Sequence, residues 1–402
     1  MFPKKPKNKK IVYLDNAAAT PLDSEVANII SKYLKNEYAN PATLYSIGVA
    51  AAKKITAARK KAAKILFTTP DTIIFTNGGT ESINLALLGL ARRHKEKGRH
   101  IITTKVEHHA VLESLQRLEK EGFIITYLEV DKFGQIDVNN LKNSLRKNTI
   151  LVSLMYANNE IGTILPIVDI GREILKYRKQ NNSAYPFFHT DACQAAGYLD
   201  LNVEKLHVDL LSINGSKIYG PKGSGILFKK REVEIEPIMY GGGQEFGLRP
   251  GTENTAGILG ITRALELAQN AKQKNNKKIF EIRNYFWKKI KKNINDVILV
   301  GPELKIENRL PNNLNVIFKG LEVESLILYL DHYGIMCSSG AACSMGAKGT
   351  SHVLKACFTL NKDEQRSIRF TLGKNIAKAE IDYVLKYLKQ IVKELRRVEQ
   401  IK

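Results

Sequence analysis

Short apolar runs rich in β-branched residues alternate with helical patterns along the first two-thirds of the chain. The runs predict strands over 72–76, 100–104, 124–130, 149–156, 186–191, 208–213 and 225–228. Several of them are separated by helical segments, near 81–97, 108–121, 137–147 and 167–180. Because strands that alternate with helices form sheets covered on both faces, the pattern predicts an α/β fold with a mostly parallel central sheet.

The pattern changes after about residue 265. A long helical stretch, interrupted near Asn275–Asn276, comes first. A strand, a helix, a Gly/Ser/Ala-rich segment and a basic helix follow in order, over 314–318, 322–334, 337–351 and 379–399. We therefore expect a large α/β domain and a smaller α+β domain, made of residues 25–265 and of residues 1–24 and 266–402.

Composition places the chain among ordinary globular proteins. Of its 402 residues, 44% are hydrophobic and 25% charged, and no apolar run reaches the roughly 18 residues of a membrane span. The basic start "MFPKKPKNKK" is not followed by an apolar segment of signal-peptide length, so we expect a cytoplasmic protein. Four cysteines without CxxC or Cys/His ligand spacing indicate free thiols and no metal site.

The formal net charge of +22 raises the possibility of nucleic-acid binding. The lysines, however, are spread over every predicted helix, which is typical of solvated helix faces. We therefore do not expect direct nucleic-acid binding, although a non-enzymatic basic binding protein stays open as an alternative.

The stretch "FTNGGTESINLALLGLA" leads from a predicted strand through Gly78-Gly79-Thr80 directly into a helix. Glycines let backbone N–H groups approach a ligand, and a helix N-terminus favours an anion such as phosphate. A tight turn capped by Thr80 would give the same pattern, so both interpretations stay open here.

A second stretch, "FFHTDACQAAG", has Asp191 at the end of a predicted strand, where ligands gather in open parallel sheets. Lys217 follows in the Gly/Ser turn "INGSKIYGPKGSG". A lysine that can form a Schiff base and a carboxylate that keeps a pyridine nitrogen protonated are what pyridoxal phosphate (PLP) chemistry needs. Taken singly, Asp191 could be a helix cap and Lys217 a solvated cation.

Ten motifs in order make the chain similar to a known family. It resembles the cysteine desulfurases of the NifS/IscS-like kind, within the class V aminotransferase family of fold-type I PLP enzymes, over nearly its whole length. The motifs are "YLDNAAATP", "NPATLYSIG", "TNGGTESINLA", "EHHAVL", "NNEIGTILPI", "HTDACQAAG", "SKIYGPKGSG", "GGGQEFGLRPGTEN", "SSGAACS" and "SIRFTLG".

The resemblance implies a role for each matching residue around the cofactor ring. Lys217 is the Schiff-base lysine, Asp191 pairs with the pyridine nitrogen, and Gln194 hydrogen-bonds the ring oxygen. His108 stacks on the ring and shuttles protons, whereas His109 is expected to face away. The cofactor phosphate is held by Gly79, Thr80, Asn214, Ser216 and, from a partner subunit, Thr252.

The resemblance also implies how the substrate is held. Asn159, beside the cofactor, and Arg369 fix the substrate carboxylate, for which a guanidinium is well shaped. Cys343 is the nucleophile, and the Gly/Ser/Ala-rich composition around it is typical of a mobile loop. We expect Cys337 to be packed and Cys193 to face the core.

Two positions depart from the family pattern. The family usually has Ser-x-His immediately before the lysine, where this chain has Asn214-Gly215-Ser216. Both replacements can hydrogen-bond, but the imidazole and its charge are absent, which puts PLP affinity in question. Tyr45 replaces a His that is common in "NPATLYSIG", and nothing in the sequence explains that change.

The activity implied by the resemblance is removal of sulfur from L-cysteine by a homodimer. The products are L-alanine and a persulfide on Cys343, which passes its sulfur to an iron–sulfur scaffold or tRNA-thiolation protein. Selenocysteine lyase and other PLP enzymes of the fold, such as aminotransferases, are the alternatives. An aminotransferase needs no thiol at position 343, which argues against it.

Overall fold

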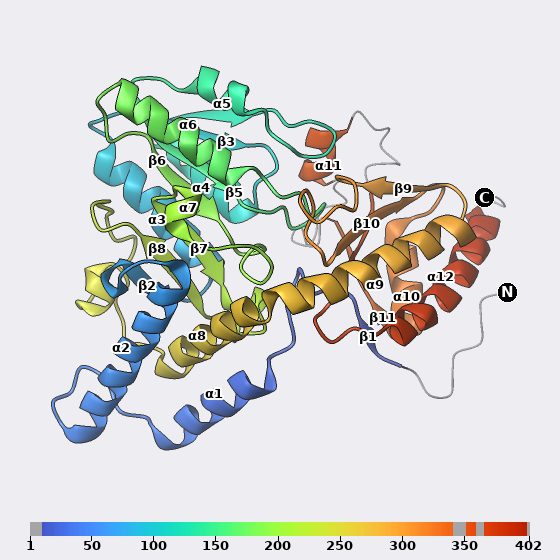
Figure 1. Ribbon diagram of the computed structural model, residues 1–402, viewed down its shortest axis with the longest axis horizontal. Helices are drawn as coiled ribbons and strands as arrows, with labels where there is room; N and C mark the ends of the chain where they lie inside the picture. Colours follow the sequence, from blue (N-terminus) through green and yellow to red (C-terminus); the bar gives the residue numbers. More distant parts are fainter. Residues whose placement is uncertain (1–9, 341–350, 359–365, 400–402) are drawn as a thin grey trace.

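The computed structural model describes residues 10–340, 351–358 and 366–399 (Figure 1). Seven strands form its largest sheet, in the order β2-β8-β7-β6-β5-β3-β4. All are mutually parallel except β8, which runs against both of its neighbours. The strands are β2 (Ile73–Thr76), β3 (His100–Thr104), β4 (Ile124–Leu128), β5 (Thr149–Met155), β6 (Phe187–Asp191), β7 (Leu210–Asn214) and β8 (Gly225–Lys229). The mostly parallel sheet expected from the sequence is therefore confirmed.

Helices cover both faces of this sheet (Figure 1). Successive side chains of a strand point to opposite faces, so Ile101 packs with α3 and α4 in one hydrophobic cluster and Ile102 packs with α6 and α8 in another. The α-helices of the first 270 residues are α1 (Ser24–Asn36), α2 (Ser46–Leu66), α3 (Gly79–His94), α4 (His109–Lys120), α5 (Val138–Ser144), α6 (Ile167–Gln180), α7 (Val203–Leu206) and α8 (Thr255–Asn270). Strands buried on both sides explain the unbroken apolar runs in the sequence.

A second, four-stranded antiparallel sheet has the order β12-β13-β10-β9. The first strand of the chain, β1, pairs in parallel with β11, a short strand that lies just before β12 in the sequence. The elements are β1 (Val12–Tyr13), α9 (Lys272–Asn293), β9 (Val297–Val300), β10 (Asn313–Phe318), α10 (Val323–His332), β11 (Ile335–Met336), β12 (Ser338–Ser339), α11 (His352–Cys357), β13 (Ile368–Thr371) and α12 (Lys378–Glu399). The domain boundaries at residues 25 and 265 stay a prediction.

The long helical stretch is interrupted at Ala271 between α8 and α9, so the predicted break near Asn275–Asn276 is wrong. Asn276 lies inside α9, where its side-chain amide donates to the carbonyl of Tyr198. This tertiary contact offsets the low helix propensity of asparagine. No helix within residues 10–340, 351–358 and 366–399 is long and apolar enough to cross a membrane.

Candidate active site

Lys217 lies at the end of a single 3₁₀ turn, Gly215–Lys217, in the connection between β7 and β8. Gly215 is needed in this turn, because a Cβ there would lie 2.3 Å from Ser224 Oγ and 2.8 Å from the carbonyl oxygen of Pro221. Asn214 stabilises the turn, since its Oδ1 accepts hydrogen bonds from the N–H and the hydroxyl of Ser216. The Gly/Ser-rich sequence around the lysine therefore serves to place its side chain.

The amine of Lys217 meets the segment that follows β1. Its Nζ donates to the carbonyl oxygens of Ala17 and Ala18 at 2.9 and 2.5 Å. Gln194 Nε2 donates to the same Ala17 oxygen at 3.0 Å. Thr20 joins the segment to the turn, because its N–H and hydroxyl both donate to the Ser216 carbonyl. The structure thus brings Lys217 and Gln194 to one backbone oxygen.

Asp191 ends β6 and is 6% exposed. Its Oδ1 accepts from the N–H of Cys193 at 2.9 Å, which fixes the carboxylate at the carboxyl end of the parallel strands. The carboxyl group of Glu107 is close enough to interact electrostatically with Asp191, and burial raises the pKa of Glu107 to about 8. Glu107 is therefore mostly protonated at pH 7, so it adds little negative charge beside Asp191.

His108 caps the N-terminus of α4, and its Nδ1 accepts from the N–H of Ala110 at 3.0 Å. In the neutral imidazole the proton then resides on Nε2. Burial is the main cause that lowers the pKa of His108, opposed by the negative charge of Asp191. His109, expected to face away, packs its ring 4.8 Å from the ring of His352.

A cavity at the N-terminus of α3 is lined by Asn77, Gly78, Gly79, Thr80, Glu81, Asn84, Asn214, Ser216, Lys222, Gly223 and Ile238. Gly78 caps α3 without any side-chain hydrogen bond, so the helix N-terminus presents backbone N–H groups. A Cβ at Gly79 would lie only 2.7 Å from Cys193 Sγ. Glu81 is neutralised by Arg249 at 3.0 Å. This cavity has the donors and the close backbone approach that a phosphate requires.

Arg369 on β13 is 2% exposed and lies between two oxygen acceptors. Its NH2 contacts Asp15 Oδ1 at 2.9 Å, and its NH1 donates to the carbonyl of Asn159 at 3.0 Å. Its buried Nε has no hydrogen-bond partner among the residues that the structure describes. Asp15 Oδ2 accepts from the hydroxyl of Ser338, the second residue of the Gly/Ser/Ala-rich segment at 337–351. The structure therefore brings Arg369 and Asn159 together, as the resemblance requires of a carboxylate site.

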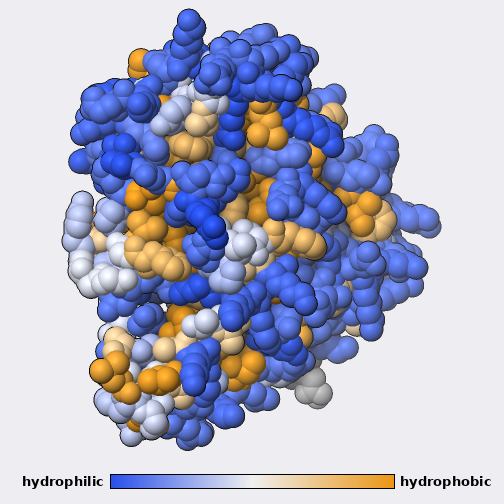
Figure 2. Space-filling view, turned by 60° about the vertical axis from the view of Figure 1, so that its left-hand side comes forward, coloured by the Kyte–Doolittle hydropathy of each residue, from blue (hydrophilic) through white to orange (hydrophobic). Residues whose placement is uncertain are grey.

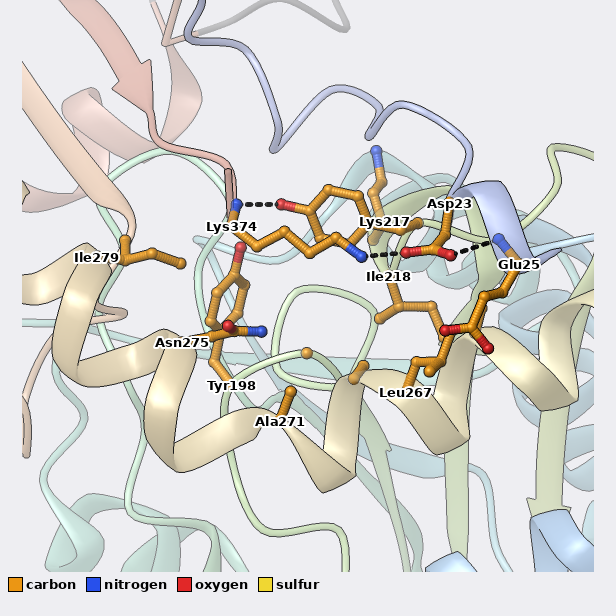
Figure 3. Close-up of a pocket in the computed structure, with 14 residues that line it drawn as sticks. Asp23, Glu25, Tyr198, Lys217, Ile218, Leu267, Ala271, Asn275, Ile279 and Lys374 are labelled. Carbon is orange, nitrogen blue, oxygen red and sulfur yellow. Dashed lines mark hydrogen bonds and ion pairs between the residues drawn. The ribbon is translucent and has the colours of Figure 1, made fainter. Parts of the chain in front are cut away.

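A second cavity, of about 260 Å³, lies behind Lys217 (Figure 3). Residues of α8 and α9, among them Leu267 and Asn275, form one wall, and the amine of Lys217 points away from this wall (Figure 3). Lys374, just after β13, forms an ion pair with Asp23 and donates its backbone N–H to the hydroxyl of Tyr219 at 2.7 Å. These bonds join the Arg369 strand to the lysine turn.

The other predicted residues are dispersed or cannot be placed. Thr252 is exposed in the segment that precedes α8. Tyr45 is half exposed at the start of α2 and makes no side-chain cap bond. Cys343 lies outside the described residues. Cys337 and Cys193 are buried, and burial raises the pKa of both thiols.

Three functional candidates were missed by the sequence reasoning: Asp15, Glu107 and the carbonyl of Ala17. All lie within motifs that carry the resemblance, "YLDNAAATP" and "EHHAVL". Position within a motif was the only available signal, because nothing in the sequence shows which carboxylate meets which cation.

A strand-end aspartate beside a lysine turn, on a mostly parallel sheet with helices on both faces, defines the fold-type I PLP-dependent transferases as the class. The chain belongs to the aminotransferase class-V family, which matches residues 12–384. PLP is a general trait of that family.

Relatives within the family are similar over almost the whole chain. A cysteine desulfurase IscS of Dictyoglomus turgidum is 46% identical over 394 residues, covering 98% of both chains. A solved NifS-like protein has a TM-score of 0.88 at 36% identity and covers 96% of this chain and 100% of its own. The structure of SspA in complex with cysteine has a TM-score of 0.77 at 33% identity, covering 91% and 99%.

Proposed function

We propose that the chain is a PLP-dependent cysteine desulfurase, which converts L-cysteine to L-alanine and leaves a persulfide on Cys343. The observation that carries the proposal is the meeting of Lys217 and Gln194 at the Ala17 carbonyl, in the segment that also supplies Asp15 to Arg369. An amine and a guanidinium held by one short segment suit a substrate that carries both an amino and a carboxylate group. The relatives named cysteine desulfurase support the choice of substrate.

The described residues fit PLP at both of its ends. The α3 N-terminus with Gly79, Thr80, Asn214 and Ser216 would hold the phosphate, and Asp191 would keep the ring nitrogen protonated. When bound, PLP supplies an aldehyde that takes up an amine and a ring that accepts electrons from the substrate Cα. The loss of the usual Ser-x-His is offset in part by the bonds between Asn214 and Ser216, which order this side of the cavity.

Each remaining residue has a separate task in the proposed reaction. Lys217 would take the Cα proton of the substrate, and Gln194 would hydrogen-bond the ring oxygen. Arg369, beside Asn159, binds the substrate carboxylate through its remaining N–H groups. His108 would lie over the ring, where its Nε2–H can donate a hydrogen bond to the substrate side.

Sulfur removal then falls to Cys343. Its thiolate forms a bond to the substrate sulfur, the substrate Cβ–S bond breaks, and the electron pair stays with the carbon. That carbon takes a proton and leaves as L-alanine, so L-cysteine and one thiol give L-alanine and one persulfide. The persulfide passes to an acceptor, for which an iron–sulfur scaffold or a tRNA-thiolation protein is proposed in the cytoplasm.

A homodimer is part of the proposal, with Thr252 reaching the phosphate of the partner's site. Figure 2 shows several separate hydrophobic patches on the face that comes forward when the left-hand side of Figure 1 is turned toward the viewer. The segments at 34–49 and 239–246 contribute large exposed apolar residues: Leu34, Tyr38, Leu44, Tyr45, Ile47, Val49, Met239, Tyr240 and Phe246. Patches of this kind are typical of protein interfaces.

The test is release of sulfide and alanine from L-cysteine by purified, PLP-supplemented protein with a reductant. We expect equal amounts of the two products, and loss of both in Lys217→Ala. Cys343→Ser should lose turnover on L-cysteine, and retained turnover on selenocysteine would indicate the lyase alternative. Absence of any product from L-cysteine in the PLP-loaded wild type would refute the proposal.

A further inference from the structure

Glu160 is a buried carboxylate that none of the proposed catalytic steps uses. It follows Asn159 in "NNEIG" and is 3% exposed. Its backbone is fixed on both sides, because its N–H donates to Asn158 Oδ1 and its carbonyl accepts from the amides of Asn313 and Asn315. The position of the Glu160 side chain is therefore set by the structure around it.

The carboxyl group of Glu160 contacts two residues that are eleven positions apart. Its Oε2 accepts from the hydroxyl of Ser351 at 2.6 Å. The same oxygen would lie 3.1 Å from a Cβ at Gly340, so the Gly340 backbone packs against it. Gly340 is fixed further by donation of its N–H to the Ser367 carbonyl. One carboxyl group thus meets both residues that border 341–350, the segment that contains Cys343.

The direction of the Ser351 hydrogen bond follows from its other contact. Ser351 caps α11, and its Oγ accepts from the N–H of Leu354 at 3.1 Å. The hydroxyl proton is therefore available to Glu160 Oε2. On the opposite side, the carbonyl of the preceding residue, Asn159, accepts from Arg369. The consecutive residues Asn159 and Glu160 therefore connect Arg369 in the carboxylate site with Gly340 and Ser351, the two residues that border 341–350.

We propose that Glu160 is a positioning residue for sulfur transfer: it holds Gly340 and Ser351 at one point and in register with Asn159 and Arg369. The inference rests on the proposed function, in which Cys343 must reach a substrate held by Arg369. Misplacing a reacting group by about 1 Å can cost about 100-fold in rate. Loss of the Glu160 contact should therefore slow the attack of Cys343 on the substrate sulfur, although Glu160 itself contacts neither substrate nor cofactor in the proposed reaction.

The experiment compares two reactions of the PLP-loaded enzyme. Sulfide release from L-cysteine needs Cys343, whereas exchange of the Cα hydrogen of L-alanine in D2O, followed by NMR, needs Lys217 and no thiol. Glu160→Ala should lower sulfide release about 10- to 100-fold and leave alanine exchange within about twofold. Glu160→Gln, whose amide oxygen can still accept from Ser351, should retain most of the activity. Glu303→Ala, at an exposed carboxylate, is the matched control.

A second variant tests whether the contact itself carries the effect. Ser351→Ala removes the donor, and if both residues act through one hydrogen bond, the double variant should be no slower than Glu160→Ala. Additive losses, or equal losses of both reactions in Glu160→Ala, would overturn the inference. A wild type that exchanges alanine but releases no sulfide would instead count against the proposed function.

Trypsin cleavage after Lys348 gives a readout that needs no catalytic activity. Release of the borders of 341–350 should speed this cleavage about tenfold in Glu160→Ala, compared with the wild type and with Glu303→Ala. An unchanged cleavage rate would overturn the inference even if L-cysteine were not the substrate.

Discussion

Replacing Glu107 with Gln should make the protein more stable at alkaline pH. The carboxyl group of Glu107 is buried next to Asp191, and its Oε1 accepts from the hydroxyl of Thr104 and the N–H of Met155. The other oxygen, Oε2, is buried and has no hydrogen-bond partner within residues 10–340, 351–358 and 366–399. A glutamine can keep both accepted bonds through its amide oxygen and carries no charge at any pH.

The sign and size of the effect follow from proton linkage. Burial raises the pKa of Glu107 to about 8 in the folded protein, from an ordinary value of 4.5. Between these values the folded state holds a proton that the unfolded chain has lost, so the contribution of Glu107 to stability is greatest below pH 4.5 and falls until about pH 8. The slope is about 1.4 kcal/mol per pH unit well below pH 8 and half of that at pH 8, so the contribution of Glu107 should fall by about 1.5–2 kcal/mol between pH 6.5 and 8.

Other buried groups with shifted pKa values do not disturb the comparison of the two proteins between pH 6.5 and 8. Burial lowers the pKa of His100 and His189 to about 4, so their contributions change only below pH 6.5, where the unfolded imidazole takes up a proton. Glu160, whose pKa burial raises to about 7, contributes equally to the wild type and to Glu107→Gln. The difference between the two proteins therefore isolates Glu107.

The assay is urea unfolding followed by circular dichroism at pH 6.5 and 8, with PLP in excess. Glu107→Gln should gain about 1.5–2 kcal/mol relative to the wild type between the two pH values. Glu113→Gln, on the exposed face of α4, should follow the wild type. Parallel pH dependence of wild type and Glu107→Gln would refute the assignment of a neutral Glu107.

Two further variants test the phosphate cavity and the carboxylate site. Gly79→Ala places a Cβ 2.7 Å from Cys193 Sγ and 3.3 Å from Asn214 Cβ, so we expect about tenfold weaker PLP binding and about 1–3 kcal/mol lower stability. PLP absorbance measures the binding and thermal melting measures the stability. Unchanged values would contradict the close packing of Gly79 against Cys193 and Asn214. Asp15→Asn removes the charge that faces Arg369, and we expect kcat/KM for L-cysteine to fall about tenfold, mainly through KM, with PLP absorbance unchanged. An unchanged KM would show that Asp15 does not orient the guanidinium.

Much of the fold was predictable because its buried strands and amphipathic helices leave strong patterns. The seven strands of the central sheet begin and end within a few residues of their predicted positions. The position of the break in the long helix was not predictable. Asn276 has the low helix propensity of a residue at a break, and only the structure shows that its side chain bonds to Tyr198 from inside α9. Local propensity is overridden there by a contact 78 residues away in the sequence.

The candidate site was predictable only as separate residues. Lys217 and Asp191 stand out by position in their motifs, and the structure confirms that a turn and a strand end carry them. Their surroundings depend on pairings between distant segments, such as the bond between Asp15 and Arg369. A sequence pattern reports which face a residue occupies, but not which residue of another element lies opposite.

The segment that follows the first strand is bonded to β13, near the end of the chain, and this affects the order in which the protein can fold during synthesis. Asn16, one residue before the carbonyl that accepts from Lys217, bonds to Thr371, 355 positions later. At the usual rates of translation, the ribosome reaches Thr371 on the order of tens of seconds after Asn16 leaves it. The central sheet can form during that time, and Thr20 can bond to Ser216, but the segment that follows β1 cannot yet bond to β13. The nascent chain therefore lacks the bond between Asn16 and Thr371 until synthesis is nearly finished, and a product truncated before β13 would never form it.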